Sequence, residues 1–339
     1  MKNAVGRELP ERVGSYEIHP YGGLGREQAY SGTVRTCRRV QRENSREPKL
    51  QKDLVSAIRA AGLRDGMTIS FHHCFREGDY TVGLVLKAIQ SLGIKGLRFA
   101  PSAVVNIQNC DLLEFLRDGT ITAVEASGIR GALGDGLLSG EVTLAEPVIL
   151  RPHGARPRAI EAGELQIDVS FLAASAADAW GNCTGQVGAN PCGSLGYAFV
   201  DAQHAGKVIV ITDTLVDYPC VPVSISQQYV DFVVTVPQIG DPAKIGAGAA
   251  RLTKNPRDLM IAKMTAELIC ASSLFRNGFS FQTGVGAISI ACTNYLAEKM
   301  RQRNITASFA LGGITAAIID LYDAGLVRAV ACSQSFDAV

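Results

Sequence analysis

Six basic side chains lie just after predicted β-strands or in the polar loops between them, where their charge could hold a carboxylate. Guanidinium groups match a carboxylate with two parallel hydrogen bonds, and imidazole is a further polar partner. Open α/β sheets bind ligands at the carboxyl ends of their parallel strands. Each side chain taken alone is equally well an ordinary surface residue. Their convergence predicts an anion site made of His72, His73, Arg76, Arg130, Arg151 and His153.

Two pairs of glycines follow predicted strands in the C-terminal part of the chain. The first pair lies within residues 281–289, between a β-prone run and an apolar-periodic helix, and the second lies within residues 307–315. Bare backbone lets a ligand approach main-chain N–H groups, which a helix start orients toward an anion or an oxyanion. Each turn alone is equally well a packing turn. We expect both at one sheet edge, presenting Gly284, Gly286, Gly312 and Gly313.

A further pair, Gly193 and Gly196, precedes a predicted helix. This pair is either a second backbone site for an anion or a turn that allows close packing. The residue pattern alone does not decide between the two interpretations.

Length and composition predict a globular protein with a large core. The chain has 339 residues, of which 47% are hydrophobic and 19% are charged, so we expect two domains. The net charge of +1 disfavours nucleic-acid and membrane partners. Because there is no run of 18 apolar residues and no signal-like start, we predict a cytoplasmic location.

The nine cysteines are scattered without a CxxC motif, which indicates reduced thiols rather than a disulfide framework. A metal site formed by His72, His73 and Cys74 is disfavoured, because consecutive residues of an extended chain point to opposite faces. We therefore expect no metal.

Strand and helix patterns alternate along most of the chain, which predicts an α/β fold with doubly wound, mostly parallel sheets. We predict an irregular leader over residues 1–48, a first domain over 49–240 and a second over 251–339, after a segment rich in Gly, Ala and Pro. A basic run from Arg35 to Arg46 lacks interleaved aromatic residues, so a leader that packs on a partner subunit is favoured over a nucleic-acid arm. Predicted strands cover residues 67–71, 97–103, 121–127, 148–151, 168–174, 207–213, 229–236, 279–281, 307–311 and 326–332, and predicted helices include 110–117, 195–204 and 257–275.

Only three strands are predicted in the second domain, so we expect it to be incomplete in this chain. Several segments together resemble the citrate lyase alpha subunit family over nearly the whole chain. They are residues 65–79, 151–154, 193–202, 253–256, 282–286 and 308–315. The resemblance implies two CoA-transferase-like open α/β domains with helices on both faces of each sheet, and a longer chain. Cys74 departs from the pattern, since a third histidine is expected there.

The resemblance also implies an activity, that of a citrate CoA-transferase, which exchanges acetyl for citryl on an acyl-carrier thioester. A citrate carboxylate attacks the acetyl thioester to give a mixed anhydride, and the carrier thiolate then attacks the citryl carbonyl and releases acetate. The implied partners are the citrate lyase beta subunit and the acyl-carrier gamma subunit, in an oligomeric complex. No cofactor is expected to be tightly bound. The six basic residues would hold citrate, and the pantetheine arm of the carrier or of acetyl-CoA would lie against Gln282, Gly284, Gly286, Gly312 and Gly313.

Many CoA-transferases of this fold carry a glutamate nucleophile on the strand after the first glycine turn. This chain has Ala310-Leu-Gly-Gly-Ile-Thr315 at that place, without a nucleophile directly before the glycines. We therefore expect direct attack by citrate, with a carboxylate elsewhere in the site as the alternative.

Two other functions fit the sequence. One is a transferase or hydrolase that acts on free acyl-CoA, and the other is a non-catalytic protein that binds a CoA ester or a small anion. A dehydrogenase is disfavoured, because no GxGxxG motif follows the first strand. The choice between citrate and citramalate as acceptor stays open.

Overall fold

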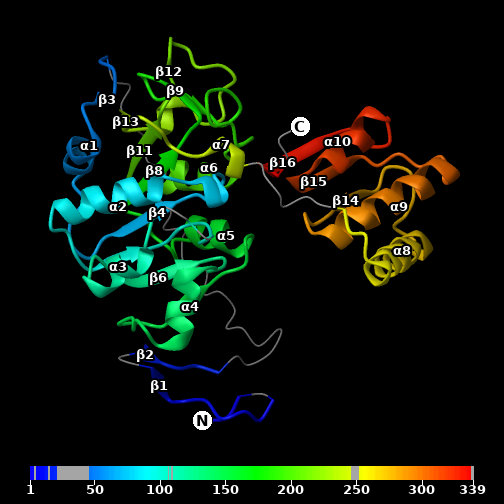
Figure 1. Cartoon of the computed structure of the whole chain (residues 1–339), viewed down its shortest axis with the longest axis horizontal. Coiled ribbons are helices and arrows are strands. Elements are labelled where there is room, and N and C mark those ends of the chain that lie inside the picture. The colour runs from blue at the N-terminus through cyan, green and yellow to red at the C-terminus, as the bar shows by residue number, and fades with distance from the viewer. Residues whose placement is uncertain are drawn as a thin grey trace.

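An eight-stranded parallel sheet forms the centre of the first domain (Figure 1). The computed structural model describes residues 1–3, 5–13, 16–20, 46–105, 107, 110–245 and 252–336. Every pairing between neighbouring strands of the large sheet is parallel. In spatial order the strands are β3 (Leu50–Gln51), β13 (Phe232–Thr235), β11 (Lys207–Thr212), β8 (Val169–Ala173), β4 (Thr68–Phe71), β5 (Leu97–Phe99), β6 (Ile121–Ala126) and β7 (Ile149–Leu150).

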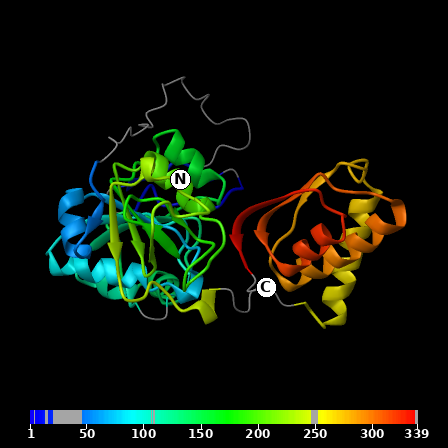
Figure 2. The same ribbon diagram turned by 90° about the horizontal axis from the view of Figure 1, so that it is seen from above.

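Helices cover both faces of this sheet, as expected for a doubly wound fold (Figure 2). From β4 to β7 each new strand is added at one side of the sheet, and after β7 the chain returns to add β8, β11 and β13 on the other side of β4. The connections before β7 therefore lie on one face of the sheet, and those after it lie on the other. One layer holds α1 (Leu54–Ala61), α2 (Thr81–Ser91), α3 (Leu112–Arg117) and α4 (Ala132–Ser139). The other layer holds α5 (Ala155–Glu161) and α6 (Gly196–His204).

The second domain is a three-stranded parallel sheet with three helices. Its strands lie in the order β14 (Ser280–Gln282), β15 (Phe309–Ile314) and β16 (Val330–Ser335), and its helices are α8 (Pro256–Ala271), α9 (Ala287–Arg303) and α10 (Ala316–Asp323). It has a hydrophobic cluster of its own, which includes Met300, Ala310 and Ile318. The mostly parallel α/β fold predicted from the sequence is confirmed.

Short elements complete the described residues. The strands β9 (Ala176–Asp178), β10 (Cys183–Thr184) and β12 (Leu215–Val216) form a small sheet, and α7 (Pro242–Ile245) follows the first domain. Near the N-terminus, β1 (Arg12–Val13) and β2 (Tyr16–Glu17) pair antiparallel. Residues 21–45, which carry most of the basic run, lie outside the described residues. No helix within the described ranges is both long enough and apolar enough to cross a membrane.

Most predicted elements are present, but several of their bounds were wrong. The strand predicted over 97–103 ends at Phe99, and the helix predicted over 257–275 ends at Ala271. The last strand begins at Val330 rather than 326, because residues 324–329 connect α10 to the sheet. The pair Gly312 and Gly313, predicted as a turn, lies inside β15 at an irregularity in its pairing with β16.

Candidate functional site

The loop after β4 carries the first three predicted site residues, and His72 anchors it. The His72 side chain is buried, and its Nε2 lies 2.7 Å from the backbone oxygen of Ala173 on β8. Its Nδ1 accepts a hydrogen bond from the backbone N–H of Cys74 at 3.2 Å. Burial lowers the pKa of His72 to about 4, which keeps the ring neutral with the hydrogen on Nε2. Both ring nitrogens are used within the protein, so His72 holds the loop in this structure, and a contact with citrate stays a prediction.

His73 lies in a cluster of three rings. Ser102 Oγ accepts from the backbone N–H of His73 at 3.0 Å and lies 2.6 Å from His73 Nδ1. The Ser102 hydrogen can therefore be donated to Nδ1, which leaves Nε2 of His73 as the donor. The ring stacks on His153 at a centroid distance of 5.4 Å and lies 4.6 Å from the ring of Tyr197. Burial and the neighbouring His153 lower the pKa of His73 to about 3.

Arg76 and Arg130 are the two arginines of the cluster that have no acidic partner among the described residues. Within the part of the chain that the structure describes, neither guanidinium lies within salt-bridge distance of a carboxylate, and Nη1 of Arg76 is buried without a hydrogen-bond partner. Burial lowers the pKa of Arg76, Glu77 opposes this, and the charge of Arg130 adds to it. Arg130 also lowers the pKa of His153, after the larger effect of burial. The site therefore holds positive charge that an anion would neutralise.

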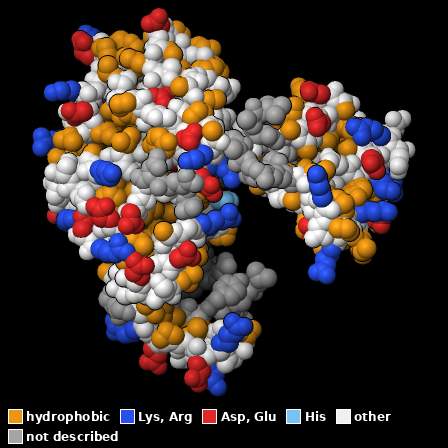
Figure 3. Space-filling view, in the orientation of Figure 1, with side chains coloured by type: hydrophobic (Ala, Val, Ile, Leu, Met, Phe, Trp, Pro, Cys, Tyr) orange, Lys and Arg blue, Asp and Glu red, His pale blue; other side chains and the backbone are white. Residues whose placement is uncertain are grey.

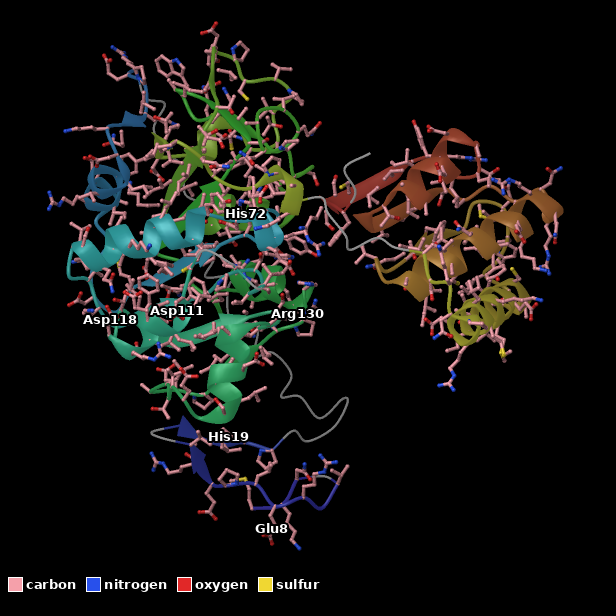
Figure 4. The ribbon with its side chains drawn as sticks, viewed as in Figure 1. Glu8, His19, His72, Asp111, Asp118 and Arg130 are labelled. Carbon is pink, nitrogen blue, oxygen red and sulfur yellow. The ribbon has the colours of Figure 1, made fainter. Side chains whose placement is uncertain are left out.

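Two residues of the site, His72 and Arg130, can be located in the view of side chains. Figure 4 shows His72 at the end of β4 and Arg130 at the edge that faces the second domain. Lys, Arg and His side chains gather along the same edge in the space-filling view (Figure 3).

Arg151 already has acidic partners. Its Nε lies 2.5 Å from Glu125 on β6, and its Nη1 lies 3.3 Å from Glu164 beyond α5. The sequence pattern could not place these carboxylates, because Glu125 is 26 residues away along the chain. Arg151 ties α5 to the sheet in this structure, and a role in binding citrate stays a prediction.

A buried ion pair that the sequence did not reveal lies beneath the cluster. Arg156 is 3% exposed, and its guanidinium donates to both carboxylate oxygens of Asp201 at 2.8 and 3.0 Å. It also donates to the backbone oxygen of Ala100 at 2.9 Å, just before the segment that carries Ser102. Ser70 Oγ completes the network at 3.0 Å from Asp201. The only hints in the sequence were an arginine in a polar loop and an aspartate on an apolar helix.

The two predicted glycine pairs lie on neighbouring segments of the second domain, because β14 and β15 pair in parallel with Gln282 opposite Leu311. Gly312 has a φ of +117°, and a Cβ there would lie 3.3 Å from the Gln282 side chain. At Gly313 a Cβ would lie 2.3 Å from the ring of Phe336. Both positions therefore require glycine.

The first turn leads directly into a helix. Gly286 is the N-cap of α9 and is exposed, and among the described residues no side chain accepts a hydrogen bond from the first N–H groups of the helix. A Cβ at Gly284 would lie 3.1 Å from Ser289 Oγ. A cavity of about 490 Å³ lies beside this turn, between α8 and α9. Free N–H groups at a helix start beside a cavity suit an anion or a developing oxyanion.

Cys74, where the resemblance leads one to expect histidine, is fully buried. Burial raises the pKa of its thiol, with a further rise from Cys192, so it stays protonated and is unsuited to nucleophilic attack. The eight cysteines among the described residues are unbridged. No three His, Cys, Asp or Glu side chains within the described ranges converge so as to hold a metal ion.

The fold defines the class of protein. A chain of a Pseudomonas malonate decarboxylase hetero-tetramer, 17% identical, superposes with a TM-score of 0.64 over 85% of this chain and 52% of that chain, which shows the fold alone. An acyl-CoA transferase from Escherichia coli O157:H7 superposes with a TM-score of 0.51 over 84% of this chain and 69% of that chain, at 15% identity. The chain thus has a CoA-transferase-like fold.

The family follows from closer relatives. The family model "Citrate lyase, alpha subunit (CitF)" matches residues 47–339. The citrate lyase alpha chains of Escherichia coli and Haemophilus influenzae are 48% and 47% identical over 88% and 87% of this chain. A crystal structure of the alpha subunit of citrate lyase from Streptococcus mutans in complex with citrate, 42% identical, superposes with a TM-score of 0.90 over 99% of this chain. The chain belongs to the citrate lyase alpha subunit family. It spans 58% of the length of the two curated relatives and 64% of the crystallised chain.

Proposed function

We propose that this chain is the citrate CoA-transferase component of a citrate lyase, which exchanges acetyl for citryl on an acyl-carrier thioester. The observation that carries the proposal is the pair Arg76 and Arg130, which have no carboxylate partner in the described residues and lie near the rings of His73 and His153. A tricarboxylate neutralises such a site, and a guanidinium binds each carboxylate with two hydrogen bonds. Membership of the citrate lyase alpha subunit family supports the same substrate.

The reaction needs a carboxylate held beside a thioester. In the first step one citrate carboxylate oxygen forms a bond to the acetyl carbonyl carbon while the carrier leaves as thiolate. In the second step the thiolate attacks the citryl carbonyl of the mixed anhydride, and acetate leaves. Both steps pass through an oxyanion, which the free N–H groups at the start of α9 are suited to stabilise. The arginines supply orientation, which alone contributes several powers of ten to a reaction between two bound groups.

The carrier arm is proposed to lie in the second domain. The cavity between α8 and α9 has a volume of about 490 Å³ and is lined by apolar side chains such as Phe279 and Phe281, with Thr283 and Ser289 among the polar ones. A pantetheine arm is largely apolar with two amide groups, so this lining suits it. The arm reaches the turn of Gly284 and Gly286 from there.

Transfer is proposed to occur without an acyl-enzyme. β15 offers no Asp, Glu, Cys or free hydroxyl directly before its glycines. Ser308 Oγ donates to the backbone oxygen of Phe279 at 3.1 Å, and Thr315 is 2% exposed at the start of α10. Within the described residues neither hydroxyl has a histidine as a hydrogen-bond partner, so activation of either as a nucleophile lacks support. Direct attack by citrate is the simpler route.

The partners are proposed from the family. Relatives carry the name citrate lyase alpha chain, which supports a complex of several subunits. We propose that the partners are a beta subunit that cleaves the citryl thioester and a gamma subunit that carries the acyl group, working in the cytoplasm.

The test is acyl exchange in the complete natural protein. Purified protein is mixed with acetylated carrier and either citrate or citramalate, and release of labelled acetate is followed. Citrate-dependent release that requires the carrier supports the proposal. Equal turnover of free acetyl-CoA without the carrier supports an ordinary CoA-transferase or hydrolase instead. Tight binding of citrate with no release of acetate identifies a non-catalytic binding protein and contradicts the proposal.

A further inference from the structure

The last strand of the second domain, β16, contacts the first domain. It is the strand of its sheet that faces the first domain in both ribbon views, and it packs against α6 (Figures 1 and 2). Ser194 Oγ, just before α6, donates to the backbone oxygen of Cys332 at 2.7 Å. β16 is therefore an interdomain contact as well as a member of a sheet.

The Gly193–Gly196 turn is shaped to admit this strand. A Cβ at Gly193 would lie 2.1 Å from Ser335 Oγ, and a Cβ at Gly196 would lie 2.8 Å from the backbone oxygen of Ser333. Gly193 also has a φ of +83°. Of the two interpretations of this glycine pair, the structure supports close packing rather than an anion site.

Gln334 connects β16 to the loop of the histidine cluster. Its side chain is 0% exposed, and its Nε2 donates to the backbone oxygens of His73 and Cys74, at 3.2 Å each. One amide nitrogen carries two hydrogens, so it satisfies both carbonyls. Its Oε1 is buried and has no partner in the described part of the chain. Buried acceptors without partners are rare and costly, which argues that Gln334 serves more than stability.

Phe336, two residues after Gln334, contacts the same loop. Residues at positions i and i+2 of an extended chain share a face, and the Phe336 ring centroid lies 4.4 Å from Cζ of Arg76. The same segment also contacts the glycine strand, because Phe336 N–H donates to the backbone oxygen of Ile314 at 2.9 Å and Ser333 Oγ donates to that of Gly312 at 3.0 Å. Residues 333–336 thus contact both the loop that carries Arg76 and the strand that carries Gly312 and Gly313.

We propose that Gln334 is a positioning residue for the transfer reaction, acting through the backbone of His73 and Cys74. By holding this loop to β16, it fixes Arg76 relative to the glycines of β15, so that a carboxylate bound by Arg76 faces the thioester. The inference rests on the function proposed above. Its physical basis is that a misplacement of about 1 Å between reacting groups costs up to about a hundredfold in rate.

The test compares three variants of the complete natural protein. Gln334→Leu keeps the apolar stem but removes both hydrogen bonds, and Gln334→Glu keeps the shape but turns a carboxylate toward two carbonyl oxygens. Ser194→Ala is the matched control, because it removes an interdomain hydrogen bond that does not reach the His73 loop. We expect kcat to fall by up to about a hundredfold in both Gln334 variants through misplacement of the reacting groups. The citrate KM should rise about tenfold in the same variants, since two neutral hydrogen bonds that hold the loop are lost. The KM for the thioester stays within about twofold in the same variants, because the cavity proposed for the carrier arm is not lined by this loop.

A merely structural role gives a different pattern. If Gln334→Leu and Ser194→Ala lower kcat equally and leave the citrate KM unchanged, the positioning role is overturned. Deuterium uptake by residues 72–76 provides a measurement that needs no activity: it rises in Gln334→Leu and not in Ser194→Ala if the loop is held by Gln334. Unchanged uptake in Gln334→Leu contradicts the inference. A wild-type protein that exchanges no acetate contradicts the proposed function instead, and the uptake then decides on Gln334 alone.

Discussion

Replacing Arg76 by lysine separates the binding of citrate from the stability of the fold. The Arg76 guanidinium is half-buried, stacks on Phe336 and has one nitrogen, Nη1, without a hydrogen-bond partner among the described residues. A bound carboxylate can take two charge-assisted hydrogen bonds from such a fork, whereas an ammonium group supplies a point charge. We therefore expect Arg76→Lys to lose one of the two bonds.

The magnitude follows from that loss. A hydrogen bond to a charged group contributes about 1.5–3 kcal/mol, so citrate affinity falls by about ten- to a hundredfold. Lysine retains the positive charge over Phe336, and the cation–π contact itself is worth about 0.5–1 kcal/mol at a site of this exposure. The melting temperature therefore changes by no more than about 4 °C.

The assay is calorimetric titration of citrate, with thermal unfolding measured on the same samples. Arg117→Lys is the control, because Arg117 is exposed and pairs with Asp111 and Glu141 away from the cluster. Its citrate affinity matches that of the wild type. Citrate binding that is unchanged in Arg76→Ala refutes the assignment of Arg76 to the anion site.

Three further substitutions test the buried polar groups. Burial raises the pKa of Asp79 to about 6, so the contribution of this carboxyl group to stability falls as pH rises from about 3.8 through 6. We expect Asp79→Asn, which cannot ionise, to stabilise the protein by about 1.4 kcal/mol more at pH 8 than at pH 5, as measured by urea unfolding. Burial lowers the pKa of His72 to about 4, so the contribution of the neutral ring to stability is complete above about pH 6.5 and is lost as pH falls. His72→Gln, which can still donate to Ala173, should reduce the acid slope of stability by about 1.2 kcal/mol per pH unit between pH 6 and 5. An unchanged slope would count against the neutral buried imidazole. Asp201→Asn leaves the buried Arg156 with an uncompensated charge and should cost about 3–5 kcal/mol at neutral pH, whereas a loss below about 1 kcal/mol would show that water reaches the pair.

The order of strands and helices was predictable because it depends on local patterns. Strands such as Val169–Ala173 are buried on both faces and therefore appear as continuous apolar runs between polar loops. The helix α4 was missed because Gly134 and Gly136 weaken its helical pattern, although Gly136 lets the Leu113 side chain pack closely against the helix. Local preference and tertiary packing disagree at that helix.

The site was predictable only in part. The position of His72, His73 and Arg76 after β4 follows from the rule that ligands bind at strand ends. What each side chain contacts depends on residues far away in the sequence: Ala173 is 101 residues from His72, and Gln334 is 261 residues from His73. No local pattern encodes such pairings, so the anchoring role of His72 and the role of Gln334 required the structure.

The origin of one oxygen atom in the released acetate tests the direct transfer most directly. In a single turnover with acetylated carrier and citrate labelled with ¹⁸O in its carboxylates, direct attack makes a citrate oxygen the bridging atom of the mixed anhydride. The thiolate then breaks the bond between that oxygen and the citryl carbon, so the oxygen leaves with acetate. We predict acetate that carries one ¹⁸O atom. Unlabelled acetate in the first turnover, together with ¹⁸O left on a Glu or Asp of the chain after the full exchange, would contradict direct attack and establish an acyl-enzyme.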